Sequence, residues 1–226
     1  MLVLAVDTAT PAVTAGVVEL TPDSPPRLLA KRVTLNAKAH GELLTPHISD
    51  ALAEAGKTYA DLDAIVVGAG PGPFTGLRVG LATAAALGQA LNRPVYPVAT
   101  TDAIAKDAAT GHPLLVATDA RRKEVYWAAY DAAGRRTDGP HVERPQDLAE
   151  KLSALGVHQA TGEGAEIYAE VLGLETLATR HPSPEGLVAA AAAEVLAKAR
   201  PAALTPLYLR RHDAVEPTGR KRVTKA

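Results

Sequence analysis

The chain has 226 residues, 47% of them apolar and 22% charged, which is enough for one large domain or two small ones with cores of their own. Its 24 basic and 25 acidic side chains give a formal net charge of -1, which excludes a chain-wide cationic field that would attract nucleic acid or a membrane. It contains no cysteine, so disulfides, thiolate metal sites and a cysteine nucleophile are excluded as well.

Three apolar runs separated by turn residues open the chain and predict antiparallel strands over residues 2–6, 13–20 and 28–35. A helix is expected next, because apolar residues recur at three- and four-residue spacing over residues 44–55. The sequence leaves the start of this helix open. Pro46 either occupies the first turn or lies inside a longer helix that begins near residue 40.

Alternating strands and helices complete the first half of the chain. The expected elements are a strand over 64–68, a helix over 77–91, a strand over 95–98 and a helix over 101–109. No apolar stretch reaches the roughly 20 residues needed to span a bilayer, and no basic and apolar leader opens the chain. The sequence therefore predicts a cytoplasmic protein with no membrane segment.

The plan of the first two strands recurs in the second half. A strand over 114–118 ends at Asp119 and is followed by a turn and a strand over 125–130, just as the first strand ends at Asp7. This recurrence predicts two copies of one structural unit. We expect an α/β protein with a first lobe over residues 1–110, a smaller second lobe over 111–210 and a basic, disordered tail over 211–226.

Weaker patterns predict the remaining elements of the second half. They are a helix over 146–155, a strand over 158–161 and an alanine-rich helix over 186–199. The cationic cluster Arg220-Lys221-Arg222 in the tail is interpreted as a solvated segment in preference to an RNA contact.

The glycine-rich stretch from Gly68 to Gly80 follows a strand and opens a helix, as a phosphate-binding loop does. It fits neither known template, because no Gly-Lys-Ser/Thr follows and Thr75 stands where a dinucleotide fingerprint has its third glycine. Pro71 and Pro73 also remove two amide donors. We therefore interpret the stretch as a structural turn.

Small residues recur every fourth position on the helix that follows, at Gly76, Gly80, Ala84 and Gly88. Glycine inside a helix costs roughly 1 kcal/mol relative to alanine, so this ridge indicates close packing against a neighbouring helix. That neighbour is either the helix over 44–55 of this chain or a helix of another chain.

Two histidines and two aspartates invite a metal or nucleotide site. His40 and His47 are two helical turns apart, roughly 10 Å, which is too far for both to bind one zinc ion. We interpret His40 as a surface or interface residue. Asp7 and Asp119 end strands where actin-like folds place magnesium-organising carboxylates, but their turns lack the glycines that approach a phosphate, so turn capping is the expected role.

Five segments together resemble one family, the bacterial TsaB (YeaZ) proteins, over nearly the whole chain. The segments are Leu4–Thr10, His40–Pro46, Gly70–Gly80, Asp119–Trp127 and Pro206–Arg210. The stretch Pro71-Gly72-Pro73-Phe74-Thr75-Gly76-Leu77-Arg78 is the most specific of the matches. The family usually has serine at Pro73 and often at Gly41, which are small departures.

The resemblance implies two actin-like (ASKHA, ribonuclease H-like) lobes, the second reduced, and a catalytic paralogue, TsaD, as direct partner. It also implies that the helices over residues 39–55 and 75–91 pair with TsaD, or with a second copy of the chain in a homodimer when TsaD is absent. The implied interface residues are His40, Leu43, Leu44, His47, Thr75, Gly76, Arg78, Gly80, Ala84 and Gly88.

In this family the ATPase TsaE joins the pair, and a threonylcarbamoyl group passes from an adenylate made by TsaC to the adenosine beside the anticodon of tRNAs reading codons that begin with A. The resemblance thus implies a non-catalytic scaffold with no cofactor of its own, ATP and metal being held by the partner subunits and tRNA being met through the complex. Two alternatives from the enzyme class stay open: a glycoprotease-like metallopeptidase and a stand-alone actin-like ATPase.

Overall fold

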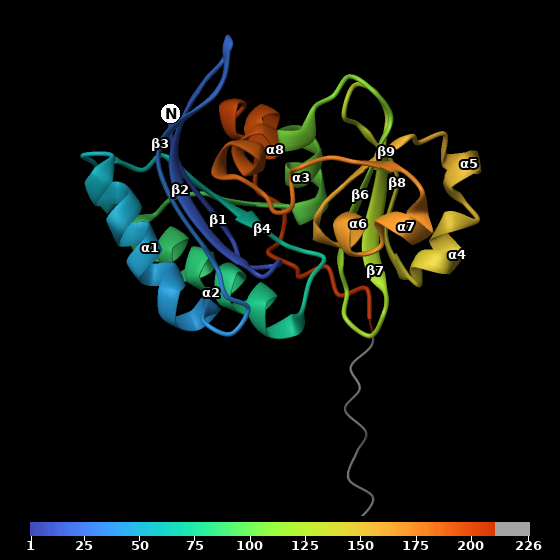
Figure 1. Ribbon diagram of the computed structural model, residues 1–226. Helices are drawn as coiled ribbons and strands as arrows, with labels where there is room; N and C mark the ends of the chain where they lie inside the picture. Colours follow the sequence, from blue (N-terminus) through green and yellow to red (C-terminus); the bar gives the residue numbers. More distant parts are fainter. Residues whose placement is uncertain (211–226) are drawn as a thin grey trace, which may run out of the picture.

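The computed structural model describes residues 1–210, and Figure 1 shows them as two α/β lobes lying side by side. The predicted basic tail over 211–226 lies outside the described residues. Among residues 1–210, none of the helices combines the length and the apolar character that crossing a membrane requires.

A five-stranded sheet forms the first lobe, in the order β3-β2-β1-β4-β5. Its strands are β1 (Leu2–Asp7), β2 (Ala12–Thr21), β3 (Ser24–Leu35), β4 (Ala64–Gly68) and β5 (Val95–Val98). The central strand β1 pairs antiparallel with β2 and parallel with β4. All five predicted strands of this lobe are therefore confirmed, and the structure extends the third one back to residue 24.

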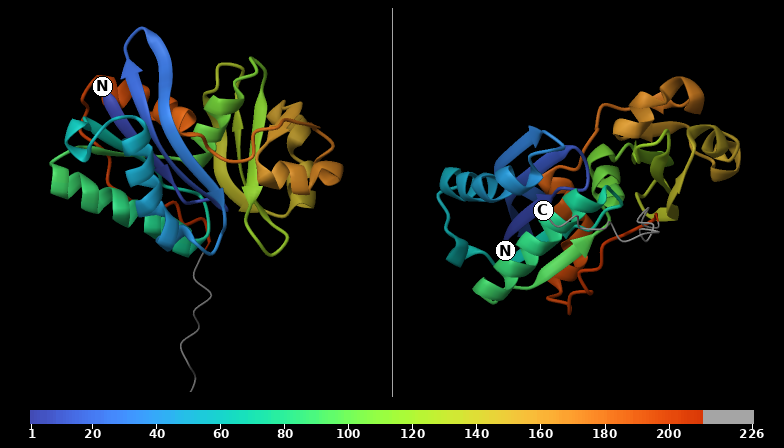
Figure 2. Two further views of the ribbon diagram at one scale, coloured as in Figure 1. Left: turned by 60° about the vertical axis from the view of Figure 1, so that its left-hand side comes forward. Right: turned by 90° about the horizontal axis from the view of Figure 1, so that it is seen from below.

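Helices cover both faces of this sheet (Figure 2). Leu4 and Val6 of β1 point to the face covered by α1 (His40–Glu54) and α2 (Phe74–Leu91). Because successive side chains of a strand alternate, Val3 and Ala5 point to the opposite face and pack on α8 (Pro184–Leu196). A single turn of 3-10 helix, η1 (Tyr59–Asp61), precedes β4.

The start of α1 is resolved in favour of the longer helix. It begins at His40, so Pro46 lies inside it. Proline cannot donate to the carbonyl four residues back, and both Pro46 and Glu42 are exposed, so the missing hydrogen bond lies on the solvent side of the helix. The helix tolerates the proline because its buried side, including Leu44 and Ile48, packs into the core.

The second lobe repeats the plan with the strand order β8-β7-β6-β9-β10. Its strands are β6 (Leu114–Asp119), β7 (Val125–Tyr130), β8 (Arg136–Glu143), β9 (Gln159–Thr161) and β10 (Glu175–Thr176). Its first strand again pairs antiparallel with the second and parallel with the fourth. This shared topology confirms the predicted repeat of one structural unit and the α/β class with two lobes.

Short helices replace the long ones on one face of the second sheet. They are α4 (Pro145–Ala149), α5 (Leu152–Leu155), α6 (Glu163–Ile167) and α7 (Ala169–Leu172). The single helix expected over 146–155 is thus two helices. The edge strand β8 was missed, because its polar sequence, which includes Gly139 and Pro140, carries no alternating apolar pattern.

Two helices stand between the lobes, and one of them corrects the expected domain boundaries. The helix α3 (Thr100–Ala108) packs Ile104 and Ala105 against the second sheet. The helix α8 was assigned to the second lobe by its place in the sequence, but Leu187 and Val188 pack in the core of the first lobe. The chain therefore returns to its first lobe after completing the second.

Ser183 fixes the start of α8 and ties it to α3. Its hydroxyl accepts a hydrogen bond from the Gly186 amide at 2.9 Å and donates one to Asp107 at 2.5 Å. We expect Ser183→Ala to lower the free energy of unfolding by about 1–2 kcal/mol, because it removes a helix cap and a partner of a largely buried carboxylate. Urea denaturation measures this. Ser153→Ala, on an exposed serine of α5, is the matched control, and equal losses in the two variants would contradict the prediction.

Candidate functional site

The turn between β1 and β2 lies at the end of the central strand of the first lobe and is built around the buried carboxylate of Asp7. Asp7 is fully buried; its carboxylate accepts hydrogen bonds from the Ala9 amide at 2.9 Å and the Thr100 hydroxyl at 2.7 Å. Burial raises the pKa of Asp7 to about 6, although these hydrogen bonds lower it. A Cβ on Gly68 would lie 1.7 Å from the carboxylate, so only glycine fits above it.

The next residue, Thr8, fastens α2 to this turn. Its hydroxyl donates to the Gly76 carbonyl at 2.7 Å and accepts from the Gly80 amide at 3.0 Å. A single side chain thus bridges two consecutive turns of α2.

The glycine-rich loop before α2 packs directly on the same turn. A Cβ on Gly72 would lie 2.1 Å from the Ala9 carbonyl oxygen. The Gly70 amide donates to the Thr100 hydroxyl at 3.2 Å. These contacts agree with the interpretation of the loop as a structural turn.

The ridge of small residues on α2 faces this chain and not outward. Its close contacts are with a turn and a strand, whereas the two expected neighbours were the helix over 44–55 and a helix of another chain. Gly76, Gly80, Ala84 and Gly88 are all buried. A Cβ on Gly76 would lie 2.2 Å from the Thr8 carbonyl oxygen, and one on Gly88 would lie 2.3 Å from the Val95 side chain. The neighbours of the ridge are therefore the β1–β2 turn and β5, and in this structure these four residues are used by contacts within the chain.

The two histidines are also used within the chain. His40 is 8% exposed, and its Nε2 lies 2.9 Å from the Thr10 carbonyl oxygen, so the expected surface position is wrong. His47 is half-buried, and its Nε2 lies 2.9 Å from the Thr34 hydroxyl. The His40 ring therefore bonds the β1–β2 turn and the His47 ring bonds the end of β3, so the two do not converge.

The remaining implied interface residues differ in exposure. Leu44 is buried and Leu43 is half-buried against the core. Thr75 and Arg78, on the first turns of α2, are exposed. Of the ten residues that the resemblance implies, these two are therefore the ones fully available to another molecule.

An aromatic clamp that sequence reasoning missed holds Arg78. The rings of Phe74 and Tyr208 lie 4.6 Å apart, and the Arg78 guanidinium lies 5.9 Å and 5.8 Å from their centroids. Its Nε donates to the Tyr208 hydroxyl at 3.0 Å. Because Leu207 donates its amide to the Ala69 carbonyl at 2.9 Å, the C-terminal segment is fastened along the first lobe. The motif Pro206–Arg210 was the signal for this clamp, but the sequence does not say what it touches.

A cavity of about 200 Å³ lies between the lobes, beside the β1–β2 turn. The first lobe contributes Thr10, Pro73 and Thr75 to it, and the second lobe contributes Asp119 and Arg121. Asp119 accepts a hydrogen bond from the Arg121 amide at 3.0 Å, so it caps its turn as expected. Two of the residues that line the cavity, Pro11 and Pro73, are prolines, and proline has no amide proton to donate to a bound anion.

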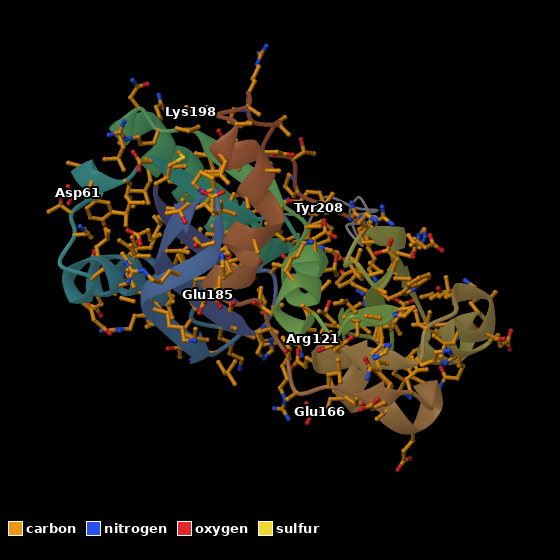
Figure 3. The ribbon with its side chains drawn as sticks, turned by 90° about the horizontal axis from the view of Figure 1, so that it is seen from above. Asp61, Arg121, Glu166, Glu185, Lys198 and Tyr208 are labelled. Atoms are coloured by element: carbon orange, nitrogen blue, oxygen red, sulfur yellow. The ribbon has the colours of Figure 1, made fainter. Side chains whose placement is uncertain are left out.

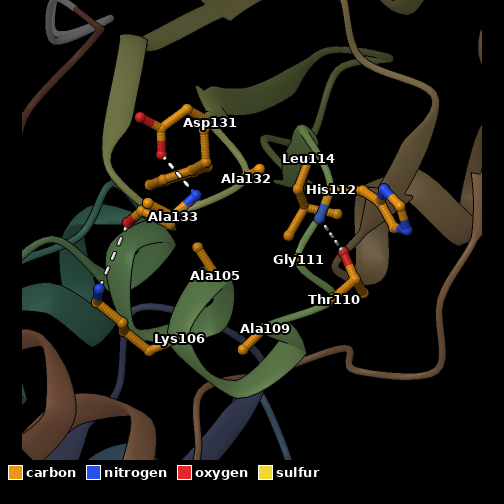
Figure 4. A pocket seen from close by; sticks show the side chains of 12 residues that line it. Ala105, Lys106, Ala109, Thr110, Gly111, His112, Leu114, Asp131, Ala132 and Ala133 are labelled. Carbon is orange, nitrogen blue, oxygen red and sulfur yellow. Dashed lines mark hydrogen bonds between the residues drawn. The ribbon is translucent and has the colours of Figure 1, made fainter.

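Another cavity, of about 110 Å³, lies between the end of α3 and the turn after β7 (Figure 4). Asp131 lines it, but its carboxylate accepts the Ala133 and Arg135 amides and so closes the turn. Lys106 reaches the Gly134 carbonyl across the cavity mouth. Its polar groups therefore serve the local fold.

Within the described part of the chain, no cluster of three or more His, Asp or Glu side chains is arranged to hold a metal ion.

Comparisons with known proteins agree with this architecture. A family model described as TsaD, tRNA N6-adenosine threonylcarbamoyltransferase, matches residues 33–223. A Mycobacterium tuberculosis protein described as uncharacterized is 52% identical over 215 residues, which cover 94% of this chain and 93% of that protein.

Two further comparisons carry the name of the family. The Escherichia coli tRNA threonylcarbamoyladenosine biosynthesis protein TsaB is 31% identical over 172 residues, covering 69% of this chain and 68% of that protein. The solved structure of YeaZ from Pseudomonas aeruginosa superposes with a TM-score of 0.76 at 28% identity, covering 92% of this chain and 99% of that one. With its duplicated lobes and sealed β1–β2 turn, the chain belongs to the TsaB (YeaZ) family, within the broader group matched by the TsaD model.

Proposed function

We propose that this chain acts in tRNA threonylcarbamoyladenosine biosynthesis as a non-catalytic scaffold subunit that pairs directly with TsaD. The name of the E. coli relative supports the pathway, and the match to the TsaD model supports a partner built on the same two-lobed plan. Subunits that share a fold present similar helices to one another, which favours a paired, nearly symmetric interface.

One observation carries the proposal: α1 and α2 cover the same face of the first sheet, and four of the exposed residues of α2 are alanines, beside Thr75, Arg78 and Gln89. Its exposed alanines are Ala82, Ala85, Ala86 and Ala90. Small exposed side chains let a partner helix approach closely, and they lose little side-chain entropy on binding. We propose this outer face of α1 and α2 as the contact with TsaD, and with a second copy of the chain when TsaD is absent.

The buried residues of the implied interface act indirectly in this proposal. Gly76 and Gly80 let α2 lie close to the β1–β2 turn. The hydrogen bonds of Thr8 to these two residues fix the position of α2 along its own axis relative to the turn. The exposed face is thereby held rigid before the partner arrives, which lowers the entropic cost of association.

We also propose that chemistry resides on the partner subunits, which hold ATP and metal, and that TsaE and tRNA are met through the complex. Three features support this division. Asp7 is sealed from solvent. The Asp119 carboxylate is used by its own turn. The loop over 70–73 fills the space beside Ala9 that a phosphate would need.

We expect Ala82→Arg to abolish the complex with TsaD at micromolar concentration, because a long charged side chain blocks close helix packing. Light scattering of the two purified proteins, mixed and alone, measures the mass of the complex. The thermal midpoint of the free variant is expected to stay unchanged, since Ala82 is exposed.

Ala193→Arg is the matched control, because Ala193 is an exposed helical alanine on α8, which covers the other face of the sheet. That variant is expected to bind TsaD as the parent chain does. A complex that survives Ala82→Arg, or a parent chain that forms none, would refute the proposed interface.

A further inference from the structure

The turn between β6 and β7 has an unusual backbone. Arg121, Arg122 and Lys123 have φ angles of 62°, 55° and 61°, so three consecutive residues with side chains adopt the left-handed conformation. This conformation is disfavoured for residues that carry a Cβ. Within residues 1–210, the other non-glycine residues with positive φ are Asn92 and Lys198, and each stands alone. Strain concentrated in this way is typical of functional segments.

Hydrogen bonds from the surrounding structure hold the turn in this shape. The Ala120 amide donates to the Glu124 carbonyl at 3.0 Å, and the Glu124 amide donates to the Arg121 carbonyl at 3.0 Å. Arg210, the last described residue, donates to the Ala120 carbonyl at 2.8 Å and pairs with the Glu124 carboxylate. The backbone direction is therefore fixed from within the turn and from the C-terminal segment.

The side chains of this turn concentrate positive charge in a chain that is almost neutral overall. Arg121 is 60% exposed and lies 3.7 Å from Asp119, and Arg122 and Lys123 are exposed as well. With Arg210, four cations gather at this turn, near the carboxylates of Asp119, Glu124 and Glu163. The sequence beyond adds further positive charge through Arg211, Arg220, Lys221, Arg222 and Lys225 against two acidic residues.

We propose that this cationic turn, residues 120–124, binds the phosphate backbone of tRNA; the inference rests on the proposed function and assigns this chain its own RNA contact. Guanidinium groups match phosphate oxygens in a planar fork, and lysine adds a point charge. Because the backbone is already fixed, binding does not carry the entropic cost of ordering the loop. The turn borders the cavity between the lobes, and Arg121 lies apart from Lys198 in Figure 3.

Salt dependence of tRNA binding tests the proposal. Each phosphate contact contributes about 0.7–0.9 to the slope of log affinity against log salt. We expect the triple variant Arg121→Gly, Arg122→Gly, Lys123→Gly to make this dependence shallower, reducing the magnitude of the slope by about 2. The same change is expected for the complex with TsaD and for the chain alone at low salt. The thermal midpoint of the variant should not fall, because glycine relieves the left-handed strain. Loss of binding is thus separated from loss of folding.

Two controls sharpen the result. The triple glutamine variant at the same positions removes the charge and keeps the strain, so it should lose the same slope. Lys198→Gly, at another exposed left-handed cation, should leave the slope unchanged.

An unchanged slope in the triple glycine variant overturns the proposal. So does loss of TsaD assembly in that variant, which would make the turn a protein contact. Absence of a TsaD complex with the parent chain would refute the proposed function instead, and the slope measured on the chain alone would still decide this inference.

Discussion

Replacing Gly76 by alanine is expected to lower the free energy of unfolding by about 3 kcal/mol, the upper end of what overpacking costs. The added Cβ would lie 2.2 Å from the Thr8 carbonyl oxygen, which is backbone and cannot rotate away. Either α2 moves outward or the β1–β2 turn shifts, and both changes break the Thr8 hydrogen bonds. For a chain of this length the thermal midpoint should fall by about 6–12 °C.

Gly41→Ala is the matched control, because Gly41 lies in α1 with nothing within 4 Å of its Cβ position. There alanine should stabilise the chain by about 0.4–1 kcal/mol, since it restricts the unfolded state. Calorimetry of both variants as free proteins decides the matter. If Gly76→Ala left the free chain as stable as before and weakened only its assembly, the ridge would face a partner after all.

The buried carboxyl of Asp7 is expected to make the chain less stable as pH rises. Its folded pKa of about 6 lies above the ordinary value of 3.8, so the folded state holds this proton more tightly than the unfolded state. Its stabilising contribution is complete below about pH 4 and is lost as pH rises through 6. The shift of about two units corresponds to about 3 kcal/mol.

Asp7→Asn isolates this effect, because asparagine stays neutral and keeps an acceptor for the Ala9 amide. Urea denaturation of both proteins from pH 4 to pH 8 should show their difference in unfolding free energy moving by about 3 kcal/mol in favour of the variant. Subtracting the two curves cancels the titrating groups that do not interact with Asp7. A difference that is flat with pH would mean that Asp7 stays ionised inside the fold.

If Gly76→Ala and the titration of Asp7 change the free energy of unfolding by these amounts, the β1–β2 turn has a structural role in the first lobe. In that case burial disfavours the charged form of Asp7, its hydrogen bonds offset part of that cost, and its glycine neighbours are required by contacts within the chain. This would agree with the proposed scaffold role, in which the chain supplies a rigid docking face.

Local patterns in the sequence were sufficient for the elements of the first lobe and for the duplication. Buried strands such as β1 and β4 are continuous apolar runs, so their positions follow from burial alone. The strand ending at Asp7 and the strand ending at Asp119 share one pattern because both start the same unit. The polar edge strand β8 carried no such pattern and was missed.

What the sequence alone determined is therefore the series of strands and helices in the first lobe, the repeated unit and the family, because each depends on residues close together in the chain. Tertiary structure decided the rest. Spacing shows that Gly76 and Gly80 share a side of α2, but only packing shows that this side meets Thr8. Residues of α8 pack in the core of the first lobe, far from them in the sequence. Arg210 donates a hydrogen bond to Ala120 in the β6–β7 turn, 90 residues earlier in the chain. Contacts of that kind depend on where the folded chain brings its surfaces together, and no local spacing encodes them.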